Sequence, residues 1–156
     1  MLPHKHLILG IVFVAVLFLL FPSIGFLGAG IILASSVLID IDHYIYYIHK
    51  TKNLNPMKAY HWYLGHHEKC KKIPKEKKKG IHFGTYFLHG IETLLILLTL
   101  GSFVSPIFYF ILIGFTFHLV TDLSFEIIKH NEYNKISVIY AFLKSRGMVF
   151  IDDLDF

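Results

Sequence analysis

Two long apolar blocks without charged side chains constrain this chain more than any other feature of its sequence. Residues 7–39 contain no Asp, Glu, Lys or Arg, and between 83 and 121 the only such residue is Glu92. Each block is longer than the roughly 20 residues that one straight transmembrane helix needs. The chain is 54% hydrophobic and 16% aromatic, which is typical of a membrane protein and not of a soluble domain.

Each apolar block also contains a break near its middle. A Phe-Pro-Ser sequence at 21–23 interrupts the first block, and Gly-Ser and Ser-Pro pairs within 101–106 interrupt the second. Proline removes a backbone donor and disfavours helix in the residue before it, so these positions suit turns at a membrane face. The pattern predicts an all-α integral membrane protein, a single domain of four transmembrane helices arranged as two hairpins. The spans are expected near 7–21, 24–42, 84–100 and 106–123.

The basic residues predict the orientation of these spans. All 15 Lys and Arg lie outside the two hairpin turns, and most of them are in the loop 49–81. The positive-inside rule therefore predicts a multi-pass protein of the cytoplasmic membrane, with both termini and this loop in the cytoplasm. A signal peptide is the alternative for the first block, but no A-x-A-type cleavage site follows it and a second span comes at once.

The segments outside the spans are expected to lie at the membrane surface. A short helix is expected in loop 49–81, and its Lys-rich run at 69–79 either holds anionic lipid headgroups or is a solvated topology signal. Apolar residues recur at helical spacing between 136 and 143, so the segment 124–156 predicts a C-terminal amphipathic helix followed by an acidic tail. Bilayer lipid is the expected partner, nucleic acid is not expected as a main partner, and an oligomer stays open.

Histidines and carboxylates gather at one end of the predicted spans. A charged group at the centre of a transmembrane helix costs about 2.5 to 3.5 kcal/mol, so such residues usually serve a function. With the predicted topology, all of them reach the cytoplasmic side, and the opposite span ends carry no ionisable residue. The set is His6, Asp40, Asp42, His43, His89, Glu92, His118 and Asp122.

Helical spacing pairs an imidazole with a carboxylate three times, because residues three or four apart share a helix face. The pairs are Asp40 with His43, His89 with Glu92, and His118 with Asp122. These six residues and His6 are the predicted ligands of one or more divalent metals, zinc first and manganese or iron as alternatives. Asp42 is the predicted general base, with a supporting or bridging role behind the ligands as alternatives. Buried ion pairs that only fix helix packing are the competing interpretation.

The remaining histidines are less specific. His61, His66 and His67 lie in the loop, where they are either interfacial residues or a second candidate site. The lone Cys70 is expected to be a reduced thiol in the cytoplasmic loop, because it has no partner for an internal disulfide.

Four segments carry a resemblance to a known family. They read His-Leu-Ile-Leu-Gly at 6–10, Leu-Ile-Asp-Ile-Asp-His at 38–43, Leu-His-Gly-Ile-Glu at 88–92 and His-Leu-Val-Thr-Asp at 118–122. In this order they resemble the YdjM-like family of membrane-bound metal-dependent hydrolases. Ile39 replaces the family's usual proline, and only His89 remains clear from its His-Arg-Gly-x-Thr-His-Ser signature, with His82 or His61 as candidates for the missing ligand.

The resemblance implies hydrolysis of a phosphoester, because that family is similar to zinc-dependent phospholipase C and single-strand nucleases. The leading expectation is therefore a metal-dependent hydrolase that acts on a lipid or soluble phosphoester at the cytoplasmic membrane face. A non-catalytic metal-binding sensor or assembly factor is the alternative. Transport is a third possibility, and it would require an oligomer.

Overall fold

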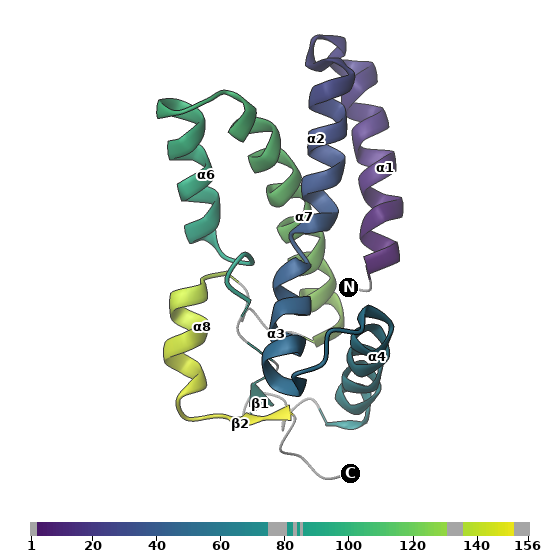
Figure 1. The fold of residues 1–156 in the computed structure, drawn as a ribbon, viewed down its shortest axis with the longest axis vertical. Helices are drawn as coiled ribbons and strands as arrows, with labels where there is room; N and C mark the ends of the chain where they lie inside the picture. The colour runs from purple at the N-terminus through teal and green to yellow at the C-terminus, as the bar shows by residue number, and fades with distance from the viewer. Residues whose placement is uncertain (1–2, 75–80, 83, 85, 131–135, 152–156) are drawn as a thin grey trace.

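Helices make up most of the chain in the computed structural model, which describes residues 3–74, 81–82, 84, 86–130 and 136–151. Four of them, α1, α2, α6 and α7, occupy the upper part of the molecule, and α3, α4, α8 and a small sheet lie below (Figure 1). The elements are α1 Pro3–Leu20, the 3-10 helix η1 Pro22–Ile24, α2 Gly25–Leu38, α3 Ile41–Thr51, α4 Pro56–Lys72, β1 Ile81–His82, α6 Ile91–Phe103, α7 Ile107–His130, α8 Val138–Ser145 and β2 Val149–Phe150.

Two helical stretches are long and apolar enough to cross a membrane, Pro22–Thr51 and Ile107–Phe125. The helices His4–Leu20 and Ile91–Phe103 are apolar but shorter. Both expected turns are present, since η1 follows Phe21 and the chain turns again between Phe103 and Ile107. The helical fold is thus as predicted, and the four-span arrangement stays a prediction.

The start of the third helix and the end of the last long helix differ from those expected. The third helix begins at Ile91 and not near 84, because residues 86–90 form a turn in which the His89 amide donates to the Tyr86 carbonyl at 3.2 Å. Gly90 is extended, with φ −139° and ψ 161°, so the helix cannot continue backwards through it. The last long helix reaches His130, beyond the expected end at 123.

The second expected span is interrupted between α2 and α3. The Asp40 amide donates to the Val37 carbonyl at 3.3 Å, and the His43 amide donates to the Asp40 carbonyl at 3.1 Å. Both bonds join residues three apart, which is tighter than the four-residue spacing of an α-helix. The chain therefore changes its helical phase at Asp40, close to the predicted site.

Small residues bring α1, α2 and α7 close together. A Cβ atom added at Gly114 of α7 would lie 2.5 Å from the Ile32 carbonyl oxygen and closer still to Ser35 Oγ. At Gly10 of α1 it would lie 2.8 Å from Ser36 Oγ. Small residues at such contacts let helix backbones approach, as is common between membrane helices. The close approach fixes the position of the next turn of α7.

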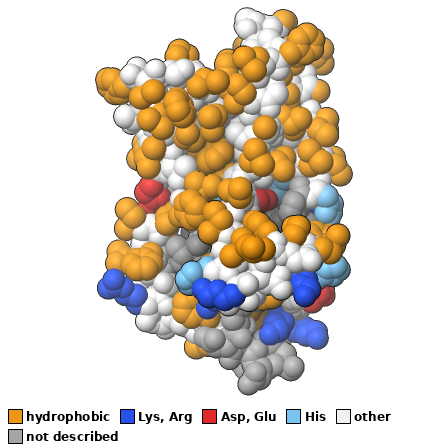
Figure 2. Space-filling model, viewed as in Figure 1, with side chains coloured by type: hydrophobic (Ala, Val, Ile, Leu, Met, Phe, Trp, Pro, Cys, Tyr) orange, Lys and Arg blue, Asp and Glu red, His pale blue; other side chains and the backbone are white. Residues whose placement is uncertain are grey.

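The lower part of the molecule holds the segments expected outside the spans. α4 occupies the loop where a short helix was expected, and α8 is the expected amphipathic helix near the C-terminus. β1 and β2 pair in parallel, and Ile73, Ile81 and Ile151 pack together beside Cys70, the single cysteine of the chain. On the face shown in Figure 2, Lys and Arg side chains occur only in this lower part. The Lys-rich stretch 75–79 and the acidic tail 152–155 lie outside the described residues.

Candidate metal centre

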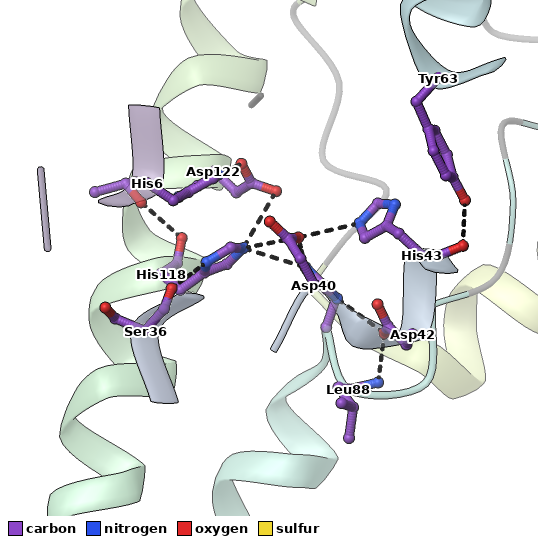
Figure 3. Close-up of polar contacts among 11 residues, drawn as sticks. His6, Ser36, Asp40, Asp42, His43, Tyr63, Leu88, His118 and Asp122 are labelled. Atoms are coloured by element: carbon purple, nitrogen blue, oxygen red, sulfur yellow. Dashed lines mark hydrogen bonds and ion pairs between the residues drawn. The ribbon is translucent and has the colours of Figure 1, made fainter. Parts of the chain in front are cut away.

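Six of the predicted site residues converge between the upper helices and the lower part of the molecule (Figure 3). They come from α1, from the α2–α3 junction and the first turn of α3, from the turn before α6, and from α7, so the chain must fold completely to bring them together. Two groups within this set could each hold a metal ion, because one ligand atom from every member lies within 4.8 Å of the others. The groups are His6, His118 and Asp122, and Asp40, His43 and His89.

The first group is buried. His6 Nε2 lies 3.0 Å from Asp122 Oδ1, and His118 Nε2 lies 3.9 Å from Asp122 Oδ2. The rings of His6 and His118 stack, with their centroids 3.9 Å apart. None of the three residues is more than 2% exposed, so this group lies away from solvent.

The second group is more accessible. Asp40 Oδ1 lies 3.5 Å from His43 Nε2 and 3.3 Å from His89 Nε2. The Asp40 and His43 side chains are 17% and 21% exposed, whereas that of His89 is 1% exposed. A small molecule that reaches the cluster would therefore meet Asp40 and His43 first.

His118 joins the two groups into one cluster. Its Nε2 atom lies 3.2 Å from His89 Nε2 and 3.5 Å from Asp40 Oδ1. The Nε2 atoms of His118 and His89 and Asp40 Oδ1 thus face a common point. The first group lies on one side of this point and the second group on the other. These are donor types that borderline divalent metals accept.

The tautomers of these histidines indicate why the cluster suits a cation. His118 Nδ1 donates to the Ser36 carbonyl at 2.8 Å, so its proton is on Nδ1. His89 Nδ1 donates to Asp42 Oδ2 at 3.0 Å, which places its proton there as well. In the neutral rings, both Nε2 atoms then carry lone pairs only 3.2 Å apart. A proton or a metal cation between them would turn this repulsion into attraction.

Asp42 lies behind the cluster. Its Oδ2 atom accepts from the Leu88 amide at 2.9 Å and from His89 Nδ1 at 3.0 Å. The residue is 1% exposed, so solvent does not reach it. Metal-binding histidines commonly donate their second ring nitrogen to a carboxylate, which fixes the ring and its tautomer. The geometry therefore matches the supporting alternative for Asp42 better than the role of general base.

Some polar atoms in the cluster lack a hydrogen-bond partner among the described residues. They include Asp40 Oδ2, Asp42 Oδ1 and His6 Nδ1, and all three are buried. Buried polar atoms are normally hydrogen-bonded or bind an ion or an ordered water. The two carboxylate oxygens, Asp40 Oδ2 and Asp42 Oδ1, belong to a cluster with several imidazoles. A cation with its bound water would suit this set of atoms.

Two tyrosines support the accessible side of the cluster. The ring of Tyr86 stacks on that of His43 with centroids 3.7 Å apart, and Tyr63 Oη donates to the His43 carbonyl at 2.7 Å. Burial, and then the neighbouring Tyr86, raises the pKa of Tyr63 well above its usual range, so the hydroxyl stays a donor. The sequence gives no sign of this contact, because no local spacing connects α4 with His43.

Glu92 does not join the cluster, although the sequence paired it with His89. Its carboxylate accepts from Ser137 Oγ and from the Val138 and Ile139 amides, at 3.0 and 3.3 Å for the two amides. It therefore attaches the N-terminus of α8 to the first turn of α6. His89 precedes α6, so the helical spacing rule does not apply to this pair.

The other histidines lie elsewhere in the structure. His61 and His66 are on α4, where each Nδ1 contacts the carbonyl four residues earlier at 2.8 Å, and His67 follows them on the same helix. Among the described residues, these histidines belong to neither of the two groups that could hold a metal ion. The side chain of His82 lies outside the described residues.

Comparisons of the chain with protein-family models, with curated proteins and with solved structures found no match.

Proposed function

We propose that the chain is a membrane-bound, metal-dependent hydrolase with four spans, formed by α1, α2, α6 and α7. The outward-facing apolar side chains support the membrane location. Only 28% of the apolar window in Pro22–Thr51 and 17% of that in Ile107–Phe125 are buried, unlike the core helices of a soluble protein. Phe26, Leu27 and Phe103 are 87%, 75% and 85% exposed, and such exposure suits lipid contact.

The proposed topology places the cluster at the cytoplasmic face. On the face shown in Figure 2, Lys and Arg side chains lie in the lower part of the molecule, where Figure 1 labels α3, α4 and α8, as expected for a cytoplasmic end. α6 has 13 residues, which span about 20 Å against a hydrocarbon thickness of about 30 Å. A local thinning of the bilayer beside α6 would bring the cluster close to the lipid headgroups.

The main evidence for a metal site is that the Nε2 atoms of His89 and His118 face each other. A divalent ion there supplies a bound water of lowered pKa and a positive charge for a phosphoryl oxygen. Zinc is the metal we propose, with manganese and iron as alternatives, because imidazole and carboxylate donors suit all three. His6 and Asp122 complete the donor set on the buried side.

The chain's own groups supply the remaining chemistry. Asp42 holds the Nδ1 proton of His89 and so keeps its Nε2 lone pair directed at the cluster. The Oδ2 atom of Asp40 has no hydrogen-bond partner among the described residues. Asp40 is also the most exposed carboxylate of the cluster. We assign to Asp40 the acceptance of a proton from an attacking water, in addition to its place in the cluster.

A phosphoester is the proposed substrate, and a lipid phosphoester fits the surface best. Ile41 and Ile45 of α3 are 50% and 45% exposed, and Leu54 and Met57 at the start of α4 are 71% and 63% exposed. This apolar surface continues past the cluster, so lipid at the membrane surface can lie beside it. The resemblance to the YdjM-like family supports the same reaction class.

The burial of His6, His118 and Asp122 favours one alternative, a metal-binding protein without catalysis. A metal held only by this closed group would join α1 to α7 and lock the bundle, as structural sites with complete protein coordination do. A sensor or an assembly factor would need no more than this.

Metal analysis and turnover on the purified protein test the proposal. We expect stoichiometric metal by mass spectrometry and hydrolysis of generic phosphodiester or phosphomonoester substrates, with both lost in His118→Ala. Glu92→Gln is the matched control, because Glu92 lies outside the cluster and should leave the metal content unchanged. Metal without turnover would support the alternative, and absence of metal even after supplementation would overturn both.

A further inference from the structure

A groove between α3 and α4 lies outside the cluster described above. It encloses about 400 Å³, which is within the size range of small-molecule sites. Lys50 and Thr51 at the end of α3 form one wall, and a face of α4 forms the other. None of its lining residues belongs to the metal cluster, so a ligand here would be independent of the metal.

Cationic groups line the groove, and none of the described residues that line it is acidic. Lys50 and Lys69 contribute two positive charges, and His61 and His66 add two imidazoles. Lys50 Nζ lies 4.7 Å from the ring centroid of Phe150, which limits the positions that this long side chain can adopt. Glu68, the acidic residue of α4, is paired with Lys71 Nζ at 2.7 Å, and neither residue lines the groove.

The two imidazoles are oriented by their own helix. His61 Nδ1 donates to the Met57 carbonyl and His66 Nδ1 donates to the Trp62 carbonyl, each at 2.8 Å. Because a carbonyl can only accept, Nδ1 is the donating nitrogen of each ring, and this bond to the helix backbone fixes the direction of the ring.

Gly65 leaves space between these side chains. A Cβ atom added at Gly65 would meet no atom within 4 Å, so close packing does not require glycine here. Glycine in a helix interior costs about 1 kcal/mol relative to alanine. At this position it lets a ligand approach between His61, Trp62 and Lys69 without obstruction.

We propose that the α3–α4 groove binds a phosphate-type anion, either the headgroup of an anionic lipid or a free phosphate compound. Two lysines, two imidazoles and an open helix surface suit phosphate oxygens. The two lysines, and a described lining without any carboxylate, argue against a metal ion as the occupant. α3 carries Asp42 and His43 in its first turn and Lys50 in its last, so the groove and the cluster share one helix.

The single tryptophan of the chain, Trp62, provides the measurement. It lines the groove, and its ring centroid is 3.8 Å from that of His66, so a bound anion should change its fluorescence. Purified full-length protein is titrated with inorganic phosphate, with glycerol phosphate, and with phosphatidylcholine nanodiscs that contain or lack phosphatidic acid. A saturable response to phosphate or glycerol phosphate would identify a soluble ligand, and a response only to phosphatidic acid would identify a lipid headgroup.

Four variants assign the response to the groove. Lys50→Gln and Lys69→Gln should each weaken binding about fivefold, the factor expected for one basic residue near an anion. Gly65→Glu should weaken it about tenfold or more by placing a carboxylate in the open space. Lys71→Gln removes the same charge from the side of α4 that does not line the groove, and it should leave the affinity within about twofold of wild type.

Three results would contradict a phosphate-type ligand in the α3–α4 groove. Equal weakening by Lys71→Gln and Lys69→Gln would show a diffuse charge effect, and no saturable response to any of the probes would show no site. A response to zinc alone that phosphate does not displace would make the groove a metal site. Gly65→Ala, which has room and favours the helix, controls for folding and should bind as wild type does.

Discussion

Replacing Asp42 by asparagine tests whether this carboxylate supports the cluster or performs the chemistry. The substitution keeps the volume of the side chain, and the amide oxygen can still accept from the Leu88 amide and from His89 Nδ1, now at 2.9 and 3.0 Å from Oδ2. It removes the negative charge that makes the His89 ring a stronger donor to a metal. Loss of such a supporting carboxylate typically weakens metal affinity 10- to 100-fold, which is about 1.4 to 2.7 kcal/mol.

The assay is competition with a chelator of known affinity, followed by turnover at saturating metal. If Asp42 supports His89, metal affinity falls by this factor and most of the turnover returns once the metal is supplied in excess. If Asp42 is the general base, affinity changes little and turnover stays low at every metal concentration. Unchanged affinity and unchanged turnover would refute both roles.

Three further substitutions test other parts of the structure. Gly114→Ala should lower the free energy of unfolding by about 1 to 3 kcal/mol through overpacking, which is measured as a lower melting temperature. Gly30→Ala should not lower it, because the added Cβ would have no atom within 4 Å. Tyr63→Phe should lose about 1 kcal/mol with the hydrogen bond to the His43 carbonyl. Because the folded pKa of Tyr63 is raised, stability should fall as pH rises above about 10, and less steeply in Tyr63→Phe. Glu92→Gln should speed proteolysis near α8, seen by mass spectrometry as earlier cleavage after Lys144 or Arg146, while the metal content stays the same.

The helices and their turns could be predicted because they depend on local sequence. Charge-free blocks require an apolar environment, and prolines at 22 and 106 cannot continue a regular helix, so two hairpins follow without knowledge of tertiary contacts. The gathering of histidines and carboxylates followed from the same topology, since alternate spans begin and end on one side. His118 and Asp122 needed only regular helical spacing within α7.

The pairing of His89 with Glu92 could not be judged from sequence, because it depends on where α6 begins. That boundary is fixed by distant residues: the Ile91 amide donates to the Ile136 carbonyl at 3.0 Å, and the Glu92 carboxylate binds the first turn of α8. A Cβ at Gly90 would lie 2.9 Å from the Val138 backbone nitrogen. Contacts across more than 40 positions leave no periodic signal, so the spacing rule was applied to a segment that is not helical.

The break between α2 and α3 explains how Asp40 and Asp42 both engage His89. On a regular α-helix, residues two apart point about 200° away from each other, so the two carboxylates could not contact opposite nitrogens of one ring. The three-residue hydrogen bonds around Asp40 alter the helical phase, and the imidazole then lies between Asp40 Oδ1 at 3.3 Å and Asp42 Oδ2 at 3.0 Å. The hydrogen bond from Nδ1 to Asp42 fixes the orientation of the ring, so its Nε2 atom stays directed at Asp40 and His118. The interruption of an apolar span, which costs helical hydrogen bonds, thus gives the cluster its fixed geometry.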